Sequence, residues 1–355
     1  MLRGNTACEE VDAAVLSAYL AVHAPLVGRV NTIEQFHGGF SNLTYLLKTD
    51  RGEFVLRRPP RGIAQGSAHD MGREYRVLSA LASSSVAAPR PVVHCADASV
   101  IGAPFYLMER VFGIILRGEP IEVPAPDVMR RLSESFVDTL VTIHAVPLDD
   151  PGITALGKPD GYVARQVNGW TARWQKSRTD DVPPMDRAAE WLAAHQPKER
   201  GSALIHNDYK YDNLVLSPID LSSVRAVLDW EMATLGDPLL DVGTALGYWV
   251  EAGDDPALRS LGLGATALPG NFTRTELWQR YLEKSGRGHA DPLFYYVFGL
   301  FKIAVIAQQI YFRFRKGLTN DGRFARLGDA VRLLATIANC AIDSGSITSL
   351  RAATS

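Results

Sequence analysis

The feature that most constrains the fold of this chain is a group of polar residues between two short apolar runs, at residues 203–216. The segment reads Ala-Leu-Ile-His-Asn-Asp-Tyr-Lys-Tyr-Asp-Asn-Leu-Val-Leu and contains the pattern His-x-Asp-x4-Asn, at His206, Asp208 and Asn213. Short apolar runs bounded by polar residues are typical of buried strands, so the sequence predicts a strand, a tight loop and a second strand. Such a loop would hold an acidic and an amide side chain together in a cleft.

A further acidic residue, Asp229, ends the next apolar run, Ala226–Leu228. A strand here would place Asp229 in the same cleft. Phosphoryl transfer needs a carboxylate that orients the attacking hydroxyl, and oxygen ligands for the metal that neutralises the phosphates. We therefore predict that Asp208 is the base and that Asn213 and Asp229 bind Mg²⁺. The alternative is that the acidic residues only cap turns, as many loop aspartates do, but the three residues together favour a site.

The first third of the chain has the pattern of a small antiparallel sheet. Its strand-like runs are rich in apolar and β-branched residues, and Gly-containing turns separate the first three, as in a β-meander. The runs are 31–36, 43–48, 53–57, 92–95 and 105–111. Between the third and the fourth run, Ser67 is predicted to cap a helix that reaches about Leu81.

After residue 112 the apolar residues recur at helical spacing, interrupted only by the strand-like patch around residues 203–228. The helices are expected at 127–146, 161–176, 184–195, 238–250, 273–284, 292–316 and 323–342. The sequence therefore predicts an α+β fold with two lobes. The N-lobe, residues 1–111, would be a small antiparallel sheet with one helix, and the C-lobe, residues 112–355, would be mainly helical with a short hairpin.

The N-lobe also carries residues that suit a phosphate site. A turn between its first two strands contains Gly38, Gly39, Ser41 and Asn42. Such a turn can place backbone N–H groups and the Ser and Asn side chains over phosphates, although Gly-Gly turns are common in hairpins. Arg57 ends a strand and Glu74 lies in the following helix. A strand cation paired with a helix Glu would fix the α- and β-phosphates, whereas the alternative is an exposed Arg and a solvated Glu.

Taken in order, these features resemble the aminoglycoside phosphotransferase and choline kinase superfamily. The resemblance rests on the Gly-rich turn, the strand cation, the helix Glu, His-x-Asp-x4-Asn, Asp229-Trp-Glu and Gly236-Asp-Pro-x-x-Asp241, and it extends from about residue 31 to 340. The branch that it resembles most occurs alone in bacteria and fused to certain acyl-CoA dehydrogenases in animals. The resemblance implies a protein-kinase-like fold, ATP and Mg²⁺ as cofactors, and phosphate transfer to the hydroxyl of a small molecule.

The resemblance also implies roles around the nucleotide. Residues 108–112 match the hinge between the lobes, where the backbone of Glu109 and Val111 would meet adenine and Met108 would lie beside the ring. The strand position that is usually Lys in the family is Arg57 here, which keeps the charge but changes the reach. The chain is therefore expected to be an active small-molecule kinase, or else a nucleotide-binding pseudokinase with a scaffold or regulatory role.

In the C-lobe, the resemblance implies a catalytic loop at residues 204–216 and a metal-binding segment at 226–241. Asp241 would steady the catalytic loop from the following helix, and His206 is expected to anchor this loop rather than to act as acid or base. A helix is expected from Pro238, soon after Asp229, which leaves no long segment for a protein substrate. Protein kinase activity is therefore disfavoured.

The charge distribution bears on the acceptor. The net charge of −2 indicates neither a nucleic-acid partner nor the strongly acidic cleft that a polycationic antibiotic would favour. Basic residues occur in segments expected to face the cleft, namely Arg165, Arg173, Lys302, Arg313, Arg315 and Lys316. They favour an anionic or neutral hydroxylated substrate over an aminoglycoside or choline-type acceptor. The resemblance suggests a hydroxyacyl-CoA or a related hydroxy acid.

The remaining features concern the cellular setting. The three cysteines, Cys8, Cys95 and Cys340, lie far apart, so a disulfide framework or zinc site is not expected and a cytoplasmic location fits best. The apolar stretch 293–312 contains Lys302 and two Gln residues, which favours a buried helix over a membrane span. The N-terminus lacks a signal pattern, and no feature indicates a particular oligomeric state.

Overall fold

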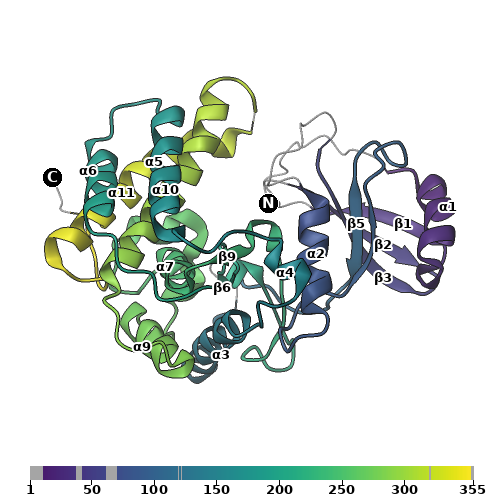
Figure 1. Cartoon of the computed structure of the whole chain (residues 1–355), viewed down its shortest axis with the longest axis horizontal. Coiled ribbons are helices and arrows are strands. Elements are labelled where there is room, and N and C mark those ends of the chain that lie inside the picture. Colours follow the sequence, from purple (N-terminus) through teal and green to yellow (C-terminus); the bar gives the residue numbers. More distant parts are fainter. Residues whose placement is uncertain are drawn as a thin grey trace.

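The computed structural model describes residues 11–36, 42–60, 70–118, 120, 122–319 and 321–352. It has the two predicted parts, a small sheet-containing N-lobe and a larger, mainly helical C-lobe (Figure 1). The α+β fold class is confirmed. The arrangement follows from the sequence texture, because alternating apolar runs need a sheet and the later periodic segments need helices that bury one face.

The N-lobe contains a five-stranded antiparallel sheet in the order β1-β2-β3-β5-β4. Its strands are β1 (Val30–Gln35), β2 (Leu43–Thr49), β3 (Gly52–Arg58), β4 (Pro91–Cys95) and β5 (Phe105–Glu109). The first three form the predicted meander, in which Leu43 pairs with Arg58 and Thr49 pairs with Gly52. The last strand inserts next to β3, so the chain leaves the sheet from its interior rather than from an edge.

Two helices flank this sheet. Helix α1 (Ala13–His23), which the sequence reading did not predict, packs Leu16 and Leu20 into the core on the outer side of the sheet (Figure 1). Helix α2 (Met71–Leu81) lies between the sheet and the C-lobe. Its N-cap is Asp70, whose carboxylate accepts a bond from the Arg73 N–H at 2.9 Å. The prediction of Ser67 as the N-cap is therefore wrong, and Ser67 itself lies outside the described residues.

The seven helices predicted for the C-lobe are confirmed to within a few residues. They are α3 (Pro126–His144), α5 (Tyr162–Ser177), α6 (Pro183–Ala194), α7 (Pro238–Tyr248), α9 (Arg274–Ser285), α10 (Leu293–Arg315) and α11 (Leu327–Ser344). Two short helices, α4 (Pro151–Thr154) and α8 (Pro256–Leu258), lie between them. Among the described residues, α10 has the length and apolar character to cross a membrane, but most of its apolar stretch is buried against neighbouring helices.

Four short strands interrupt the helices. Strand β6 (Ala203–Ile205) pairs with β9 (Thr234–Gly236), and β7 (Leu214–Leu216) pairs with β8 (Val224–Val227). The predicted strand, loop and second strand are confirmed, and β7 and β8 form the predicted short hairpin, but the pairing of β6 with β9 was not predicted. The two strands that flank the catalytic loop belong to different sheets, because β6 pairs with β9, which lies within the metal-binding segment 226–241. The pairing therefore brings the catalytic loop and the metal-binding segment together at both ends.

The connection between the lobes is attached to the catalytic loop. Ile114 exchanges two backbone hydrogen bonds with Leu216 at the end of β7, at 2.9 and 2.8 Å. A Cβ atom on Gly113 would lie 2.3 Å from the Leu216 carbonyl oxygen. Glycine is needed at this position because real Cβ atoms do not approach that closely. The linker is thus held against the C-lobe directly after the predicted hinge.

Helices α7 and α10 approach each other through two glycines. A Cβ on Gly299 would lie 2.1 Å from the Gly243 carbonyl oxygen, and a Cβ on Gly243 would lie 2.2 Å from the Tyr295 carbonyl oxygen. These are backbone atoms, which cannot move aside as the end of a flexible side chain can. This contact sets the distance of α7, and so of Asp241 in its first turn, from the centre of the C-lobe.

We expect Gly299→Ala to lower the free energy of unfolding by about 1–3 kcal/mol, because the added methyl forces α7 and α10 apart. Urea denaturation measures the change. Gly169→Ala in α5 is the matched control, because its Cβ would meet only the flexible end of Arg173, at 3.2 Å. The control is expected to be neutral or stabilising, since Ala is a better helix former than Gly. Equal stability of the two variants would contradict the close approach.

Candidate active site

A single buried carboxylate holds the start of the catalytic loop. Asp241, in the first turn of α7, accepts the His206 N–H at Oδ2 and the Asn207 N–H at Oδ1, both at 2.7 Å. Burial pushes the pKa of Asp241 upward, but the hydrogen bond from His144 and the backbone donors outweigh it and hold the pKa below its usual value. The prediction that Asp241 steadies this loop is confirmed.

His206 connects the catalytic loop with the metal-binding segment. Its Nδ1 accepts the Asp208 N–H at 3.2 Å, so its Nε2 carries the proton and donates to the Leu228 carbonyl at 2.9 Å. The neighbouring Asn207 side chain donates to the Met232 carbonyl at 3.1 Å. Both imidazole nitrogens are used in these bonds, which agrees with the predicted anchoring role of His206.

The predicted base and one predicted metal ligand are in direct contact. The Asn213 side-chain amide donates to Asp208 Oδ2 at 3.0 Å and to the Asp208 carbonyl at 2.8 Å. Both bonds use Nδ2 and leave Oδ1, the atom that a metal would bind. Lys210 donates to both Asp208 carboxylate oxygens, at 2.9 and 2.7 Å. The sequence reading did not select Lys210, although its place inside the His-x-Asp-x4-Asn pattern was a signal.

Arg57 brings the N-lobe to the other predicted metal ligand. Its Nη1 is paired with Glu74 of α2, which is the predicted strand–helix pair. Its Nη2 lies 3.0 Å from Asp229 Oδ1 and 3.3 Å from Glu231 Oε2. Residues from β3, α2 and the segment between β8 and β9 therefore meet at one guanidinium. Glu231 was named only as part of a motif in the sequence, and its role here depends on this long-range contact.

The three carboxylates around Arg57 carry different charges. Burial, followed by the nearby charge of Asp229, raises the pKa of Glu231 to about 8. Burial also raises the pKa of Glu74, to about 6, against the opposing effect of Arg57. For Asp229, burial acts upward as well, but the charge and hydrogen bond of Arg57 prevail and lower the pKa. At neutral pH, Asp229 is therefore ionised and Glu231 is largely protonated.

The remaining predicted nucleotide contacts lie before the start of β2 and at the end of β5. Asn42 donates from Nδ2 to Glu231 Oε2 at 2.8 Å, whereas Gly38, Gly39 and Ser41 lie outside the described residues. In the hinge, Met108 is buried at the end of β5. The Glu109 N–H is bonded to the Arg90 carbonyl at 2.9 Å, and Val111 lies two residues further on. The adenine contacts stay a prediction.

The donor set suits magnesium. Mg²⁺ takes oxygen ligands, keeps several waters and commonly binds one or two protein carboxylates together with substrate phosphates. Asp229 offers a carboxylate and Asn213 an amide oxygen, within one pair of linked loops. The part of the chain that the structure describes contains no group of three His, Cys, Asp or Glu side chains that would hold a metal. A metal bound here would depend on phosphate oxygens as well.

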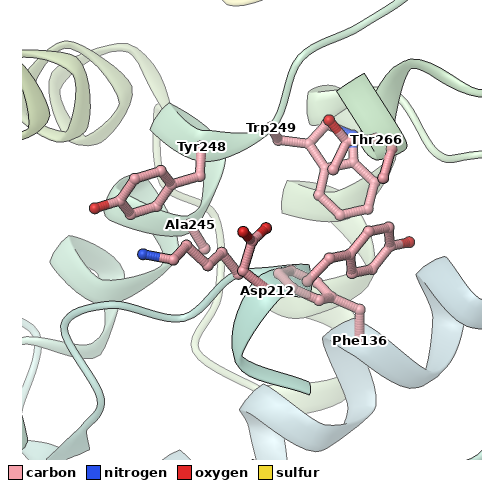
Figure 2. A pocket seen from close by; sticks show the side chains of 9 residues that line it. Phe136, Asp212, Ala245, Tyr248, Trp249 and Thr266 are labelled. Atoms are coloured by element: carbon pink, nitrogen blue, oxygen red, sulfur yellow. The ribbon is translucent and has the colours of Figure 1, made fainter. Parts of the chain in front are cut away.

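A small pocket lies against residues 210–212 of the catalytic loop, and Lys210 links it to Asp208. Figure 2 shows Tyr248 on one side of Asp212, with Trp249, Thr266 and Phe136 on the other. The Lys210 ammonium lies 4.6 Å from the centroid of the Tyr248 ring, and burial raises the pKa of Asp212. The enclosed volume is about 10 Å³, roughly the space of one water. The pocket combines aromatic walls with two charged groups.

The expectation that Lys302 faces the cleft is wrong. Its ammonium is buried and donates to the Asn207 carbonyl at 2.7 Å, underneath the catalytic loop. Helix α10 is surrounded by α5, α6, α7 and α11, so a side chain in its middle cannot reach the cleft. Two other basic residues that were expected to face the cleft make contacts nearby. Arg165 bonds to the Asp160 carbonyl, and Arg315 lies 3.7 Å from Asp180.

The bilobal fold is that of the kinase-like phosphotransferases. A crystal structure from Ralstonia eutropha JMP134, of a protein provisionally named an aminoglycoside phosphotransferase, superimposes with a TM-score of 0.77 and 31% identity, over 92% of this chain and 96% of that one. The GDP complex of aminoglycoside 2′-phosphotransferase-IIIa gives a TM-score of 0.63 at 16% identity, over 91% and 98% of the two chains. That second likeness concerns the fold alone.

The family follows from the sequence match. The model of the phosphotransferase enzyme family matches residues 32–278, and the chain belongs to this family. Acyl-CoA dehydrogenase family member 10 of Mus musculus is 34% identical over 87% of this chain, which spans 29% of that protein. Family member 11 of Homo sapiens is 33% identical over 86% of this chain, which spans 40% of it. The chain thus corresponds to well under half of these relatives.

We expect Glu231→Gln to stabilise the protein at alkaline pH. The folded-state pKa of Glu231, about 8, lies above its ordinary value of 4.5. As pH rises, the carboxyl group therefore loses its proton in the unfolded state at a lower pH than in the folded state. The contribution of Glu231 to stability is therefore lost as pH rises between these values. Gln has no such titration and still offers an oxygen to Asn42 and Arg57. Urea denaturation at about pH 5 and about pH 9 measures the difference.

Glu190→Gln on the exposed face of α6 is the control for this experiment and is expected to follow the wild-type curve at both pH values. If Glu231→Gln shows the wild-type loss of stability between these two pH values, the assignment of the raised pKa to Glu231 is wrong.

Proposed function

We propose that this protein transfers the γ-phosphate of ATP to the hydroxyl of a small molecule, with Asp208 as the base. The observation that carries the proposal is the linkage of two loops through β6–β9, β7–β8 and His206, which gathers Asp208, Asn213 and Asp229 in one place. Phosphoryl transfer depends mainly on positioning and on charge stabilisation, and this arrangement supplies both. The membership of the phosphotransferase enzyme family supports the reaction class.

In the proposed complex, the N-lobe holds the nucleotide. The backbone of Glu109 and Val111 meets adenine, with Met108 beside the ring, and Arg57 faces the phosphates. The turn that contains Gly38, Gly39, Ser41 and Asn42 covers them. Nucleotide complexes of structural neighbours, such as the GDP complex of aminoglycoside 2′-phosphotransferase-IIIa, support a nucleotide in this position. Mg²⁺, when bound, neutralises the phosphate charge, and Asn213 and Asp229 would hold it.

Asp208 performs the proton step. Its carboxylate orients the acceptor hydroxyl and takes its proton as the new oxygen–phosphorus bond forms and the bond to ADP breaks. In the present structure, Lys210 and Asn213 occupy the Asp208 oxygens. A carboxylate has about four acceptor sites, so the acceptor hydroxyl can bind Asp208 beside these donors. The Lys210 ammonium then lies close to the reacting groups.

The acceptor is proposed to be a hydroxyacyl-CoA or a related hydroxy acid. Lys210 places a positive charge beside Asp208, which suits an anionic acceptor, and the aromatic side chains of Tyr248, Trp249 and Phe136 lie next to Lys210. Helix α7 begins at Pro238, directly after β9, which leaves little room for an extended peptide. The names of the relatives point the same way, because they are acyl-CoA dehydrogenase family members.

The test measures Mg²⁺-dependent ATP consumption with a panel of hydroxyacyl-CoAs, hydroxy acids, amino alcohols, sugars and aminoglycosides. We expect turnover with a hydroxyacyl-CoA or hydroxy acid, and a fall in kcat of about 10²- to 10⁴-fold in Asp208→Asn, which removes the base. Asp220→Asn, in the exposed turn between β7 and β8, is the matched control and should keep wild-type activity. Full activity of Asp208→Asn would refute the mechanism.

A nucleotide-binding pseudokinase is the second candidate, favoured by one observation. Arg57 stands where the family usually has Lys, and it is engaged with the predicted metal ligand Asp229 at 3.0 Å. A pseudokinase would bind ATP with no turnover across the whole panel. In that case, turnover that appears only in Arg57→Lys would identify this substitution as the cause of the inactivity.

A further inference from the structure

Lys302 is a cation in the middle of α10, a largely buried helix of the C-lobe. It lies between Phe301 and Ile303 in α10, and 1% of its surface is exposed. Burying an ammonium group costs several kcal/mol unless hydrogen bonds and opposite charges compensate. Its hydrogen bonds within the described part of the chain go to two neutral oxygens of Asn207, the carbonyl oxygen at 2.7 Å and Oδ1 at 3.1 Å. The burial of this ammonium group, with its hydrogen bonds directed at one residue, Asn207, needs an explanation.

The bonded carbonyl belongs to the peptide group that enters Asp208. The N–H of the same peptide donates to His206 Nδ1 at 3.2 Å, so Lys302 and His206 hold the Asn207–Asp208 peptide from its two sides. Asn207 has a φ of 67°, a left-handed conformation that Asn tolerates better than most residues. Because a peptide group is planar, fixing both its oxygen and its nitrogen sets the direction in which the Asp208 side chain leaves the loop.

The neighbouring contacts fix other parts of the loop. Asp241 holds the two preceding N–H groups, those of His206 and Asn207, and the Tyr162 hydroxyl contacts the Asn207 amide at 3.2 Å. Without Lys302, these bonds would keep the loop in place but would leave the Asn207 carbonyl buried without its charged donor. A buried carbonyl without a donor is unfavourable, and a rotation of the peptide would relieve this cost. That rotation would move Asp208.

We propose that Lys302 is a positioning residue for phosphate transfer, which acts through the Asn207–Asp208 peptide to set the Asp208 carboxylate against the acceptor hydroxyl. This inference rests on the proposed function of Asp208 as the base. The charged groups that face Lys302 are Asp241 of α7, Asp208 and Lys210 of the catalytic loop, and Arg173 of α5. The two carboxylates favour the ammonium form, and the two cations oppose it.

The test compares Lys302→Met with Gln308→Met. Gln308 is a matched control, because it is also a buried donor of α10, and it bonds to the Ser177 carbonyl at 2.7 Å, away from the catalytic loop. Burial lowers the pKa of Lys302 to about 8, so assays at about pH 7 keep the wild-type ammonium largely protonated. The readouts are kcat, the acceptor KM, the Kd of Mg·ATP and the free energy of unfolding.

We expect Lys302→Met to lower kcat by about 100-fold, the effect of a misplacement of about 1 Å, while the acceptor KM and the Kd of Mg·ATP stay near wild type. Gln308→Met is expected to lose comparable stability and to keep kcat. Lys302→Gln, which retains an N–H donor one atom short of the original, is expected to keep more activity than Lys302→Met. If Lys302→Met does not fold, Lys302→Gln is compared with Gln308→Met instead.

A kcat of Lys302→Met equal to that of Gln308→Met would overturn the inference, and so would a loss explained wholly by weaker Mg·ATP binding. The Asp208→Asn variant distinguishes a failure of the Lys302 inference from a failure of the proposed function. If wild type turns over and Asp208→Asn does not, while Lys302→Met retains kcat, only the role of Lys302 is wrong. If wild type shows no turnover with any acceptor, both proposals are refuted.

Discussion

The buried carboxylate of Asp241 is the constraint on which the geometry of the site depends. It accepts two consecutive backbone N–H groups, from His206 and Asn207, that a loop in this turned conformation cannot satisfy by itself. Because Asp241 lies in the first turn of α7, the loop takes its position from the helix core. The glycine contact between α7 and α10 in turn fixes that helix. Packing in the C-lobe is therefore transmitted to the residue that precedes Asp208.

The contact between the lobes has a different character. Next to the bond from Asn42 to Glu231, it contains one shared guanidinium, that of Arg57, which is paired with Glu74 of its own lobe and with Asp229 and Glu231 of the other. One cation cannot neutralise three carboxylates, and a proton on Glu231 removes one of the two surplus negative charges. In this state the predicted metal ligand Asp229 is paired with Arg57. Nucleotide and metal would therefore have to replace a contact that joins the lobes.

Local rules recovered most of the elements and the order of the site residues. The C-lobe helices were predictable because apolar spacing and N-terminal Pro or Asp signals, as at Asp237–Pro238, act over a few residues. Helix α1 was missed, since its apolar residues show little periodicity and its role depends on the sheet it covers. The pairing of β6 with β9, which was missed, and the direction of Lys302, which was wrong, both concern partners distant in sequence. Such partners leave no local pattern.

The sequence by itself determined which groups are present and in what order, namely Arg57, Glu74, Asp208, Asn213 and Asp229, because residue type and short-range spacing are properties of the chain alone. Only the tertiary structure decided what these groups contact. The pairing of β6 with β9, the sharing of Arg57 by three carboxylates and the inward direction of Lys302 depend on which surfaces meet after folding. Contacts of that kind are set by packing and burial over the whole domain, and no local pattern records them.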